Sequence, residues 1–329
     1  MFSRSLYLFI LFAIPGTVLS LGTWQNLTSI SSGPRQEECV ASIGNTIYVV
    51  GGITLPPPND TLAPTVALVE AFDTTRNTWR RLADLPITMN HCNIASVSGK
   101  LYVLGGLNGQ QGAWVRTGRA FEYCPQSDAW TELSSLPEGA ERGSSAVGVW
   151  GNQVFLAGGI RTLNDTIATG LVYDTRTKKW SELPDLPEVR DHAGGAVVAG
   201  TFYVVGGRLG GRNNVRGTVF AMNLMTKERV WVEKSKMPTP RGGLAAAATD
   251  GKIYTFGGEG DLPSIGPVVF NNTEVYDTTT DSWEVFPPME IPRHGTAASA
   301  VEGKIYIPGG DVMAGRVVPV DVMNVFTPY

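Results

Sequence analysis

The chain has 329 residues, of which 43% are hydrophobic, and a formal net charge of −4. This composition supplies a large core and is typical of a globular protein. There is no run of basic residues, so we expect no nucleic acid among the partners. The 39 glycines and 21 prolines recur at regular places, which excludes a low-complexity chain.

Residues 1–20 have the layout of a secretory signal peptide. Arg4 precedes an apolar run over residues 6–14, and the following segment PGTVLS suits cleavage after Ser20. This run is too short to span a bilayer, which takes about 20 residues. We therefore expect a secreted protein whose mature chain, 21–329, forms a single domain with no membrane span.

Four Asn-x-Ser/Thr sequons fit a secreted glycoprotein, and we expect them on loops. They begin at Asn26, Asn59, Asn164 and Asn271.

A repeat of about 50 residues organises the rest of the chain. Glycine pairs begin at residues 51, 105, 158, 206, 257 and 309, and tryptophans stand at residues 24, 79, 130, 180, 231 and 283. A period of this size indicates one supersecondary unit per repeat, as in a propeller or a solenoid.

Each unit predicts four strands in a fixed order. The first strand is rich in small residues, as in GLAAAATD, and a tight turn such as DGK follows it. The second is β-branched and aromatic, as in IYVV, and stops at the glycine pair. A variable loop leads to the third strand, and a short polar turn leads to the fourth, which begins at the tryptophan.

The two ends of the chain complement each other. Trp24 has no first three strands of its own, while the sixth glycine pair is followed by a third strand, VMNVFTPY, and by no tryptophan. The N-terminal segment thus supplies the fourth strand of the last unit and removes the free edge of the ring. We predict an all-β fold, a closed ring of six four-stranded blades.

These marks resemble the Kelch repeat. IYVVGG, then YD before a tryptophan, then LPDLPEVR or MPTPR recur over residues 22–329. The resemblance implies a propeller, but fold does not imply function. Kelch propellers include ubiquitin-ligase adaptors, actin-binding proteins, plant specifier proteins, a secreted sialic-acid epimerase and the copper enzyme galactose oxidase.

Two metal sites of that family are not matched by this sequence. A copper site similar to that of galactose oxidase would require a histidine directly preceded by tyrosine. Here the residues that precede the three histidines are Asn90, Asp191 and Arg293. An iron site similar to that of the specifier proteins would require Glu, Asp and His spaced four residues apart. The segment EVRDH at residues 188–192 contains these three residue types but not this spacing.

One register of the repeat carries a recurring arginine. The residue sixteen positions before each glycine pair is Arg in five units and Met in one: Arg35, Met89, Arg142, Arg190, Arg241 and Arg293. We expect a structural role in which each guanidinium ties a blade edge to its neighbour, because a binding site has no need to recur in every blade.

Two positions further on, the residues differ, and three of them can carry acid–base chemistry. The register holds Glu37, His91, Ser144, His192, Gly243 and Gly295. His91, His192 and Glu37 are therefore candidate catalytic residues. Imidazoles with a carboxylate are also a reasonable metal ligand set. However, His294 is one register off, and no HxH or HxxxH spacing occurs, so we expect no metal and no other cofactor.

The variable loops between the second and third strands are the candidate binding surface. We expect them to share one rim with the segments that lead into the first strands. Basic residues gather in loops two to four and acidic ones in loops five and six. This distribution suits an anionic or charged ligand, or else the loop charges pair with each other in solvent. The candidate ligand-binding residues are Trp114, Arg161, Arg208, Arg212, Arg216, Glu259 and Asp311.

Three cysteines leave one unpaired in an oxidising compartment. Cys39 and Cys92 fall on the inner strands of adjacent blades and are the candidate disulfide, while Cys124 stands at the opposite rim.

Three functions remain open at this point. The first is a secreted, monomeric binding module that captures a protein, a glycan or a small anionic ligand on the variable rim. The second is a small-molecule enzyme, an epimerase, isomerase or accessory biosynthetic enzyme, that uses the central channel. The third is a structural extracellular protein. Convergence of acid–base groups in one pocket would favour the enzyme.

Overall fold

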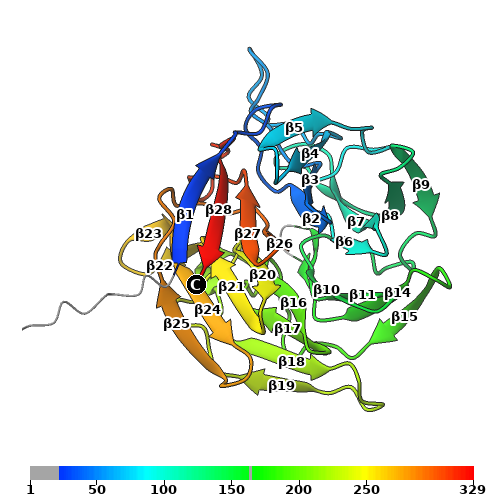
Figure 1. Ribbon diagram of the computed structural model, residues 1–329, viewed down its shortest axis with the longest axis vertical. Helices are drawn as coiled ribbons and strands as arrows, with labels where there is room; N and C mark the ends of the chain where they lie inside the picture. Colours follow the sequence, from blue (N-terminus) through cyan, green and yellow to red (C-terminus); the bar gives the residue numbers. More distant parts are fainter. Residues whose placement is uncertain (1–21, 163–164) are drawn as a thin grey trace, which may run out of the picture.

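The computed structural model describes residues 22–162 and 165–329, and these form a six-bladed β-propeller (Figure 1), whose inner strands line a central channel. The all-β, six-bladed prediction is confirmed. The segment 1–20 and the sequon asparagine Asn164 lie outside the described residues.

Every blade is an antiparallel four-stranded sheet; in blades 1 to 5 the strands follow one another in chain order from the channel to the outside, and in blade 6 the first strand of the chain takes the outermost place. Blade 1 contains β2 (Cys39–Ile43), β3 (Thr46–Val50), β4 (Val69–Asp73) and β5 (Thr78–Arg81). Blade 2 contains β6 (Ile94–Val97), β7 (Lys100–Asn108), β8 (Val115–Cys124) and β9 (Ala129–Leu133). Blade 3 contains β10 (Ala146–Trp150), β11 (Gln153–Ala157), β14 (Gly170–Asp174) and β15 (Lys179–Leu183).

Blade 4 contains β16 (Gly194–Val198), β17 (Thr201–Val205), β18 (Val219–Asn223) and β19 (Trp231–Lys234). Blade 5 contains β20 (Ala245–Thr249), β21 (Lys252–Phe256), β24 (Thr273–Asp277) and β25 (Ser282–Phe286). Blade 6 contains β26 (Ser299–Val301), β27 (Lys304–Pro308), β28 (Met323–Pro328) and β1 (Gly22–Leu27).

The ring closes as the sequence predicts. Strand β1 pairs with β28 from Gly22↔Pro328 to Leu27↔Met323, so the first strand of the chain completes the last blade. Figure 1 shows blue β1 beside red β28. Because this pairing satisfies the outer edge of β28, every blade has its fourth strand.

The hydrophobic core lies between neighbouring blades. The second and third strands contribute fully buried aromatic residues such as Phe72, Phe121, Phe155 and Phe202, while the small first strands line the channel. Small side chains suit the crowded centre of a radial array, and large ones fill the wider space between sheets.

The repeated tryptophans join each blade to the one before it. In every blade the indole Nε1 donates to a backbone carbonyl just beyond the fourth strand of the preceding blade, at 2.7–3.2 Å. Trp24 does so across the closure, to the Pro287 carbonyl at 2.8 Å. The tryptophan is thus repeated because each blade needs the same link.

The recurring arginine has two separate structural roles. Each guanidinium is buried and donates to the carbonyl of the first glycine of its own blade's pair, as Arg241 does to Gly257 at 2.6 Å. The expectation that the guanidinium reaches the neighbouring blade is therefore wrong. The backbone carbonyl makes that link: Arg241 O accepts from Gly207 N of blade 4 at 2.9 Å.

The loops between second and third strands carry secondary structure of their own. Loop three contains the β12 (Ile160–Thr162) and β13 (Asp165–Thr166) pair, loop five contains the hairpin of β22 (Glu259–Leu262) and β23 (Gly266–Val269), and loop four contains the 3-10 turn η1 (Arg212–Asn214). Among the described residues, no helix has the length and apolar character needed to cross a membrane.

Candidate functional site

The variable loops and the segments entering the first strands share one rim, as predicted. Single antiparallel bridges join them in each blade, for example Asn90↔Leu107, Asp191↔Arg208 and His294↔Asp311. The residues just before each first strand are therefore held directly beneath the loops.

A closed circuit of backbone hydrogen bonds surrounds the loop-side mouth of the channel. Each N–H in the register that holds Glu37, His91, Ser144, His192, Gly243 and Gly295 donates to the carbonyl of the equivalent residue in the preceding blade, at 2.6–3.2 Å. The last link runs from Glu37 N to Gly295 O, so six bonds close the ring. This circuit fixes the six Cα positions around the mouth.

All six residues of the circuit have positive φ. The values are 52° for Glu37, 50° for His91 and 51° for both Ser144 and His192. Glycine adopts this conformation freely and occupies the other two positions, whereas a side chain costs about 1–2 kcal/mol there. Non-glycine residues held in strained backbone cluster at functional sites, so this register is a candidate site on geometric grounds.

The three candidate catalytic residues meet at this mouth. One ligand atom from each of Glu37, His91 and His192 lies within 4.8 Å of the other two. His91 Nε2 is 3.2 Å from Glu37 Oε2, and the two imidazole rings stand edge to face with centroids 5.0 Å apart. Sequence reasoning placed these residues at one level, and the closed ring brings them into contact.

His91 is held from behind by its chain neighbour. Its Nδ1 contacts Asn90 Oδ1, while Asn90 Nδ2 donates to Thr65 Oγ1 at 2.6 Å. Burial lowers the pKa of His91 to about 3, and the nearby Arg208 acts in the same direction. The ring is therefore neutral at physiological pH.

His192 has the same arrangement with a carboxylate in place of the amide. Its Nδ1 donates to Asp191 Oδ1 at 2.6 Å. Burial lowers the pKa of His192. Burial alone would raise the pKa of Asp191, but the hydrogen bond from His192 and the charge of Arg208 outweigh it, and the net effect is a lowered pKa. Asp191 thus stays ionised beside a neutral imidazole.

Asp191 begins a polar network that crosses the rim. Arg208 donates from Nε to Asp191 at 3.0 Å and from a terminal nitrogen to Glu259 at 2.5 Å. Glu259 Oε2 lies 3.7 Å from His294 Nδ1, and Asp311 lies 4.0 Å from the other ring nitrogen of His294. His294 therefore belongs to a second group, apart from the pair formed by His91 and His192.

Loops four and five meet in ion pairs, whereas Arg161 and Arg216 pair with carboxylates outside loops five and six. Arg212 pairs with Asp261 at 3.3 Å, Arg161 with Asp165 at 2.9 Å, and Arg216 with Glu188 at 3.6 Å. With Arg208 also paired, these four candidate arginines already have carboxylate partners. An anionic ligand would have to compete with them.

Trp114 differs from these arginines because it has an unused donor. Its ring lies 5.3 Å from that of His91, and its indole N–H is buried without a hydrogen-bond partner. A buried donor without a partner costs free energy unless a ligand or water accepts from it.

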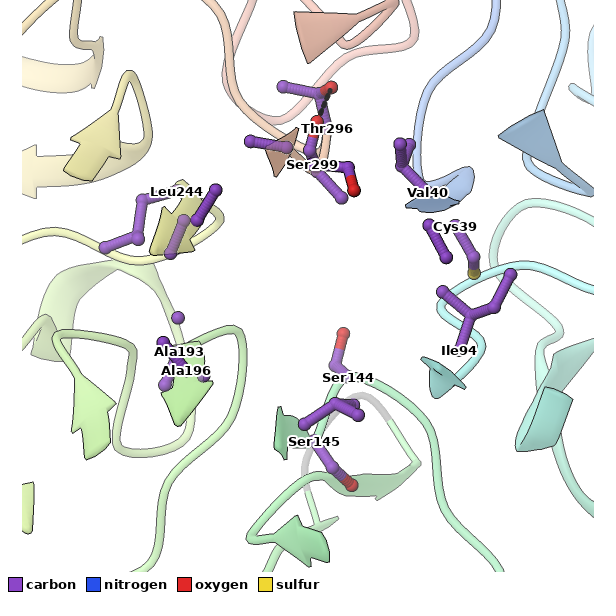
Figure 2. Close-up of a pocket in the computed structure, with 18 of the residues that line it drawn as sticks. Cys39, Val40, Ile94, Ser144, Ser145, Ala193, Ala196, Leu244, Thr296 and Ser299 are labelled. Carbon is purple, nitrogen blue, oxygen red and sulfur yellow. Dashed lines mark hydrogen bonds between the residues drawn. The ribbon is translucent and has the colours of Figure 1, made fainter. Parts of the chain in front are cut away.

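The channel below the mouth is a cavity of about 450 Å³. Figure 2 shows side chains from all six blades around it, among them Ser144, Ala196, Leu244 and Ser299. Its walls consist mainly of small side chains, which combine alanines and valines with serines and other polar groups. One wall residue, Glu38, has both carboxyl oxygens buried without a partner, and burial raises its pKa to about 8.

Sequence reasoning missed the two residues that orient the histidines. Asn90 and Asp191 precede His91 and His192 in the same register of blades 2 and 4, and the dipeptides NH and DH were the available signal. Each supplies an oxygen to its own neighbour's Nδ1.

Cys39 and Cys92 form a disulfide between blades 1 and 2, with S–S 2.10 Å and Cα–Cα 5.9 Å. Cys124 is free and lies at the outer turn.

The described sequons differ in accessibility. Asn59 lies in a loop turn, as expected, whereas Asn26 lies on β1, so the prediction that the sequons lie on loops is wrong for Asn26; both residues are exposed. Asn271 Nδ2 instead donates to Met289 O at 3.2 Å, and its sequon threonine Thr273 is fully buried.

Comparison with known proteins identifies the class to which this fold belongs. Residues 92–310 match the KLHDC2/KLHL20/DRC7 Kelch-repeats domain, and residues 39–86 match the Kelch motif. The chain therefore belongs to the Kelch-repeat family, and this membership indicates a scaffold for protein binding.

Individual relatives extend the match. Kelch-like protein terF of Aspergillus terreus is 38% identical over 319 residues, covering 93% of this chain and 68% of that protein. Kelch-like protein 34 of Homo sapiens is 28% identical over 252 residues, covering 74% of this chain and 38% of that protein. The solved structure of YjhT has the same fold, with a TM-score of 0.74 at 15% identity over 90% of this chain and 95% of that one.

Proposed function

We propose that this propeller binds a small polar molecule at the loop-side mouth of its channel. The observation that carries the proposal is the convergence of Glu37, His91 and His192 within 4.8 Å at the mouth of a cavity. Concave sites that combine apolar walls with a few convergent polar groups are typical of small-ligand binding.

The unpaired indole N–H of Trp114 supports a ligand with an acceptor, such as a hydroxyl or carbonyl oxygen. The ion-paired arginines argue against a purely anionic ligand, because each would first have to leave its carboxylate. The protein-binding role indicated by the family is compatible with this proposal, since the outer loops remain free to contact a partner.

A library of hydroxylated, carbonyl-bearing and phenolic compounds, screened by ligand-observed NMR, tests this proposal. We expect hits whose affinity falls about tenfold in Trp114→Ala, the effect of losing about one hydrogen bond. Trp150→Ala is the matched control, because Trp150 is an exposed tryptophan at the end of β10, next to the turn into β11. Hits that bind both variants equally would rule out the mouth as the site.

Acid–base catalysis at the same mouth is a second candidate. The 3.2 Å contact between His91 Nε2 and Glu37 Oε2 favours it, because a proton held between two such groups can be passed to a substrate. For a compound that turns over, we expect Glu37→Gln to reduce the rate about 10²–10⁴-fold while binding is retained. An unchanged rate would exclude proton transfer by this pair.

We also propose that the protein is a secreted glycoprotein that acts as a monomer. The layout of residues 1–20, the Cys39–Cys92 disulfide and the exposed sequon at Asn59 support this. Expression through a secretory pathway should yield a chain that begins after Ser20. The mass of the Asn59→Gln variant should be lower than that of the parent protein by one glycan. Asn271→Gln should leave the glycan mass unchanged, and light scattering of the product reads the oligomeric state.

A further inference from the structure

We propose that Glu37, His91 and His192 bind a divalent first-row transition-metal ion at the mouth of the channel. The two imidazoles and the carboxylate present ligand atoms within 4.8 Å of one another. The three residues lie just before the first strands of blades 1, 2 and 4. This inference rests on the same site as the proposed small-molecule function and adds a cofactor to it.

The hydrogen bonds behind the histidines set which ring nitrogen faces the site. His192 donates its Nδ1–H to Asp191 Oδ1 at 2.6 Å, and His91 donates its own to Asn90 Oδ1. Both Nε2 atoms are then lone-pair acceptors, and that of His91 faces Glu37 Oε2. Metal-binding histidines are held in this way, with the second nitrogen bonded to a carboxylate or carbonyl oxygen.

This arrangement leaves two acceptors facing each other. The Nε2 lone pair of His91 lies 3.2 Å from Glu37 Oε2, and both groups are largely removed from water. Two acceptors at that distance repel unless a proton or a cation lies between them. A metal ion coordinated by both atoms resolves the conflict and also uses the free Nε2 of His192.

The backbone holds the three ligands at fixed spacing. Glu37, His91 and His192 belong to the closed hydrogen-bonded circuit of the mouth, so their Cα atoms are positioned before any ion arrives. Gly295 completes the arrangement, because a Cβ atom at that position would come within 2.7 Å of Glu37 Oε1. The space for the carboxylate therefore depends on a glycine in blade 6.

The donor set defines the class of ion. Two neutral imidazoles and one carboxylate suit Zn²⁺, Fe²⁺ or Co²⁺ better than Mg²⁺ or Ca²⁺, which prefer oxygen ligands. Three protein ligands leave at least one coordination position open, as in metal sites that bind a substrate or water. A small polar molecule at the mouth would occupy that position.

Metal-free protein, prepared with EDTA and desalted, allows a direct test with Co²⁺ and Zn²⁺. We expect one equivalent of Co²⁺ to give visible d–d absorption, and Zn²⁺ to bind with the same stoichiometry by calorimetry. His91→Ala and His192→Ala should each weaken binding by at least about 100-fold, since even loss of an outer hydrogen-bond partner costs 10–100-fold.

His294→Ala is the matched control, because His294 lies on the same rim but contacts Glu259 and Asp311 instead. It should bind Co²⁺ as the unmodified protein does. Glu37→Gln keeps the size of the side chain and covers the case in which an alanine variant fails to fold. Sub-stoichiometric binding, or binding that survives in His91→Ala and Glu37→Gln, would overturn the inference.

A pair of glycine variants tests whether Gly295 positions Glu37. Gly295→Ala should weaken Co²⁺ binding and Gly243→Ala should not, because a Cβ at 243 meets nothing closer than 3.5 Å. Both glycines have φ near +60°, so the backbone strain of the two variants is matched and only the contact with Glu37 differs. Equal Co²⁺ affinity in the two variants would remove the positioning role.

The outcomes separate this inference from the proposed function. If compounds bind in a Trp114-dependent manner to protein that takes up no Co²⁺, the metal site is wrong and the small-molecule site stands. If Co²⁺ binds with the expected dependence on His91 and His192 but no compound binds, the metal site stands and the proposed ligand class is wrong.

Discussion

At the scale of single residues, this chain uses one register for structure and the next for chemistry. The arginine register is buried in five blades and donates to the same carbonyl each time. Its partner on the third strand varies: Glu274 beside Arg241, but Phe121 in the blade where Met89 replaces the arginine. In blades 1 and 5 a buried carboxylate on the third strand pairs with the guanidinium, whereas blade 2 has an apolar residue in place of each group.

This variation predicts the effect of removing a single partner. Arg241→Met removes the guanidinium partner of Glu274, whose side chain is 1% exposed, so we expect the free energy of unfolding to fall by about 3–5 kcal/mol. The double variant Arg241→Met/Glu274→Phe copies the residues of blade 2 and should recover most of that loss. The double-mutant cycle compares the free energies of unfolding, measured by urea denaturation, of the parent protein, the two single variants Arg241→Met and Glu274→Phe, and the double variant. If the losses in the two single variants add up to the loss in the double variant, the expected coupling is contradicted.

At the scale of elements, the closure depends on one short strand. Strand β1 carries Trp24, whose ring centroid lies 5.4 Å from that of Phe256 and 5.0 Å from that of Phe326. Its indole N–H donates to the Pro287 carbonyl. The same link recurs in every blade, but only here does it join the beginning of the chain to its end. Trp24 therefore adds side-chain contacts to the six paired positions through which β1 and β28 close the ring.

Trp24→Ala should lower the free energy of unfolding by about 3 kcal/mol, because it removes a large packed side chain and a hydrogen bond to the neighbouring blade. Trp150→Ala, at a tryptophan that is 42% exposed, should change it by less than about 0.5 kcal/mol. Thermal and urea unfolding of both variants measure the difference. Similar losses in the two would show that the Trp24 contacts do not hold the ring closed.

At the scale of the whole molecule, a disulfide adds a covalent link between two blades. Cys39 and Cys92 are 53 residues apart in sequence and lie at the channel wall of blades 1 and 2. A cross-link over a loop of that length restricts the unfolded chain, which the loop-entropy model equates to about 4 kcal/mol of stabilisation. The bond lies directly below the mouth and also restrains the segments that carry Glu37 and His91.

Cys39→Ala/Cys92→Ala should therefore unfold about 2–4 kcal/mol more easily than the parent protein. Cys124→Ala should leave stability unchanged, since that thiol is free. A reductant should lower the urea midpoint of the parent protein to that of the double variant and have no effect on the double variant itself. A double variant as stable as the parent would contradict this role.

The sequence predicted the fold well because its signals are local and repeated. Glycine pairs, tryptophans and the turn residues are signals contained within a single repeat, and six copies reinforce one another. Even the closure could be read, since the two ends lack complementary parts of one unit. The direction of the arginine side chain could not be predicted from the sequence, because both its own blade and the next one offer carbonyl oxygens within reach.

The candidate site was predicted only in part. The shared register of Glu37, His91 and His192 followed from counting, and the structure confirms that the loops lie on their side of the ring. The sequence suggested a basic half and an acidic half of the rim, whereas in the structure basic and acidic loops pair with each other. Arg208, for example, contacts Glu259, which is 51 residues further along the chain. Sequence alone carries no information on which of these opposite charges find each other.

The sequence by itself determined the number of blades, their strand order and the way the ring closes. Those features depend on hydrophobic alternation, turn chemistry and a fixed period, all of which are properties of the local chain. Only the tertiary structure decided which side chains converge, because closing six blades into a circle sets the distance from Glu37 to His91 and from His91 to His192. Those distances depend on the ring as a whole, and no single repeat contains them.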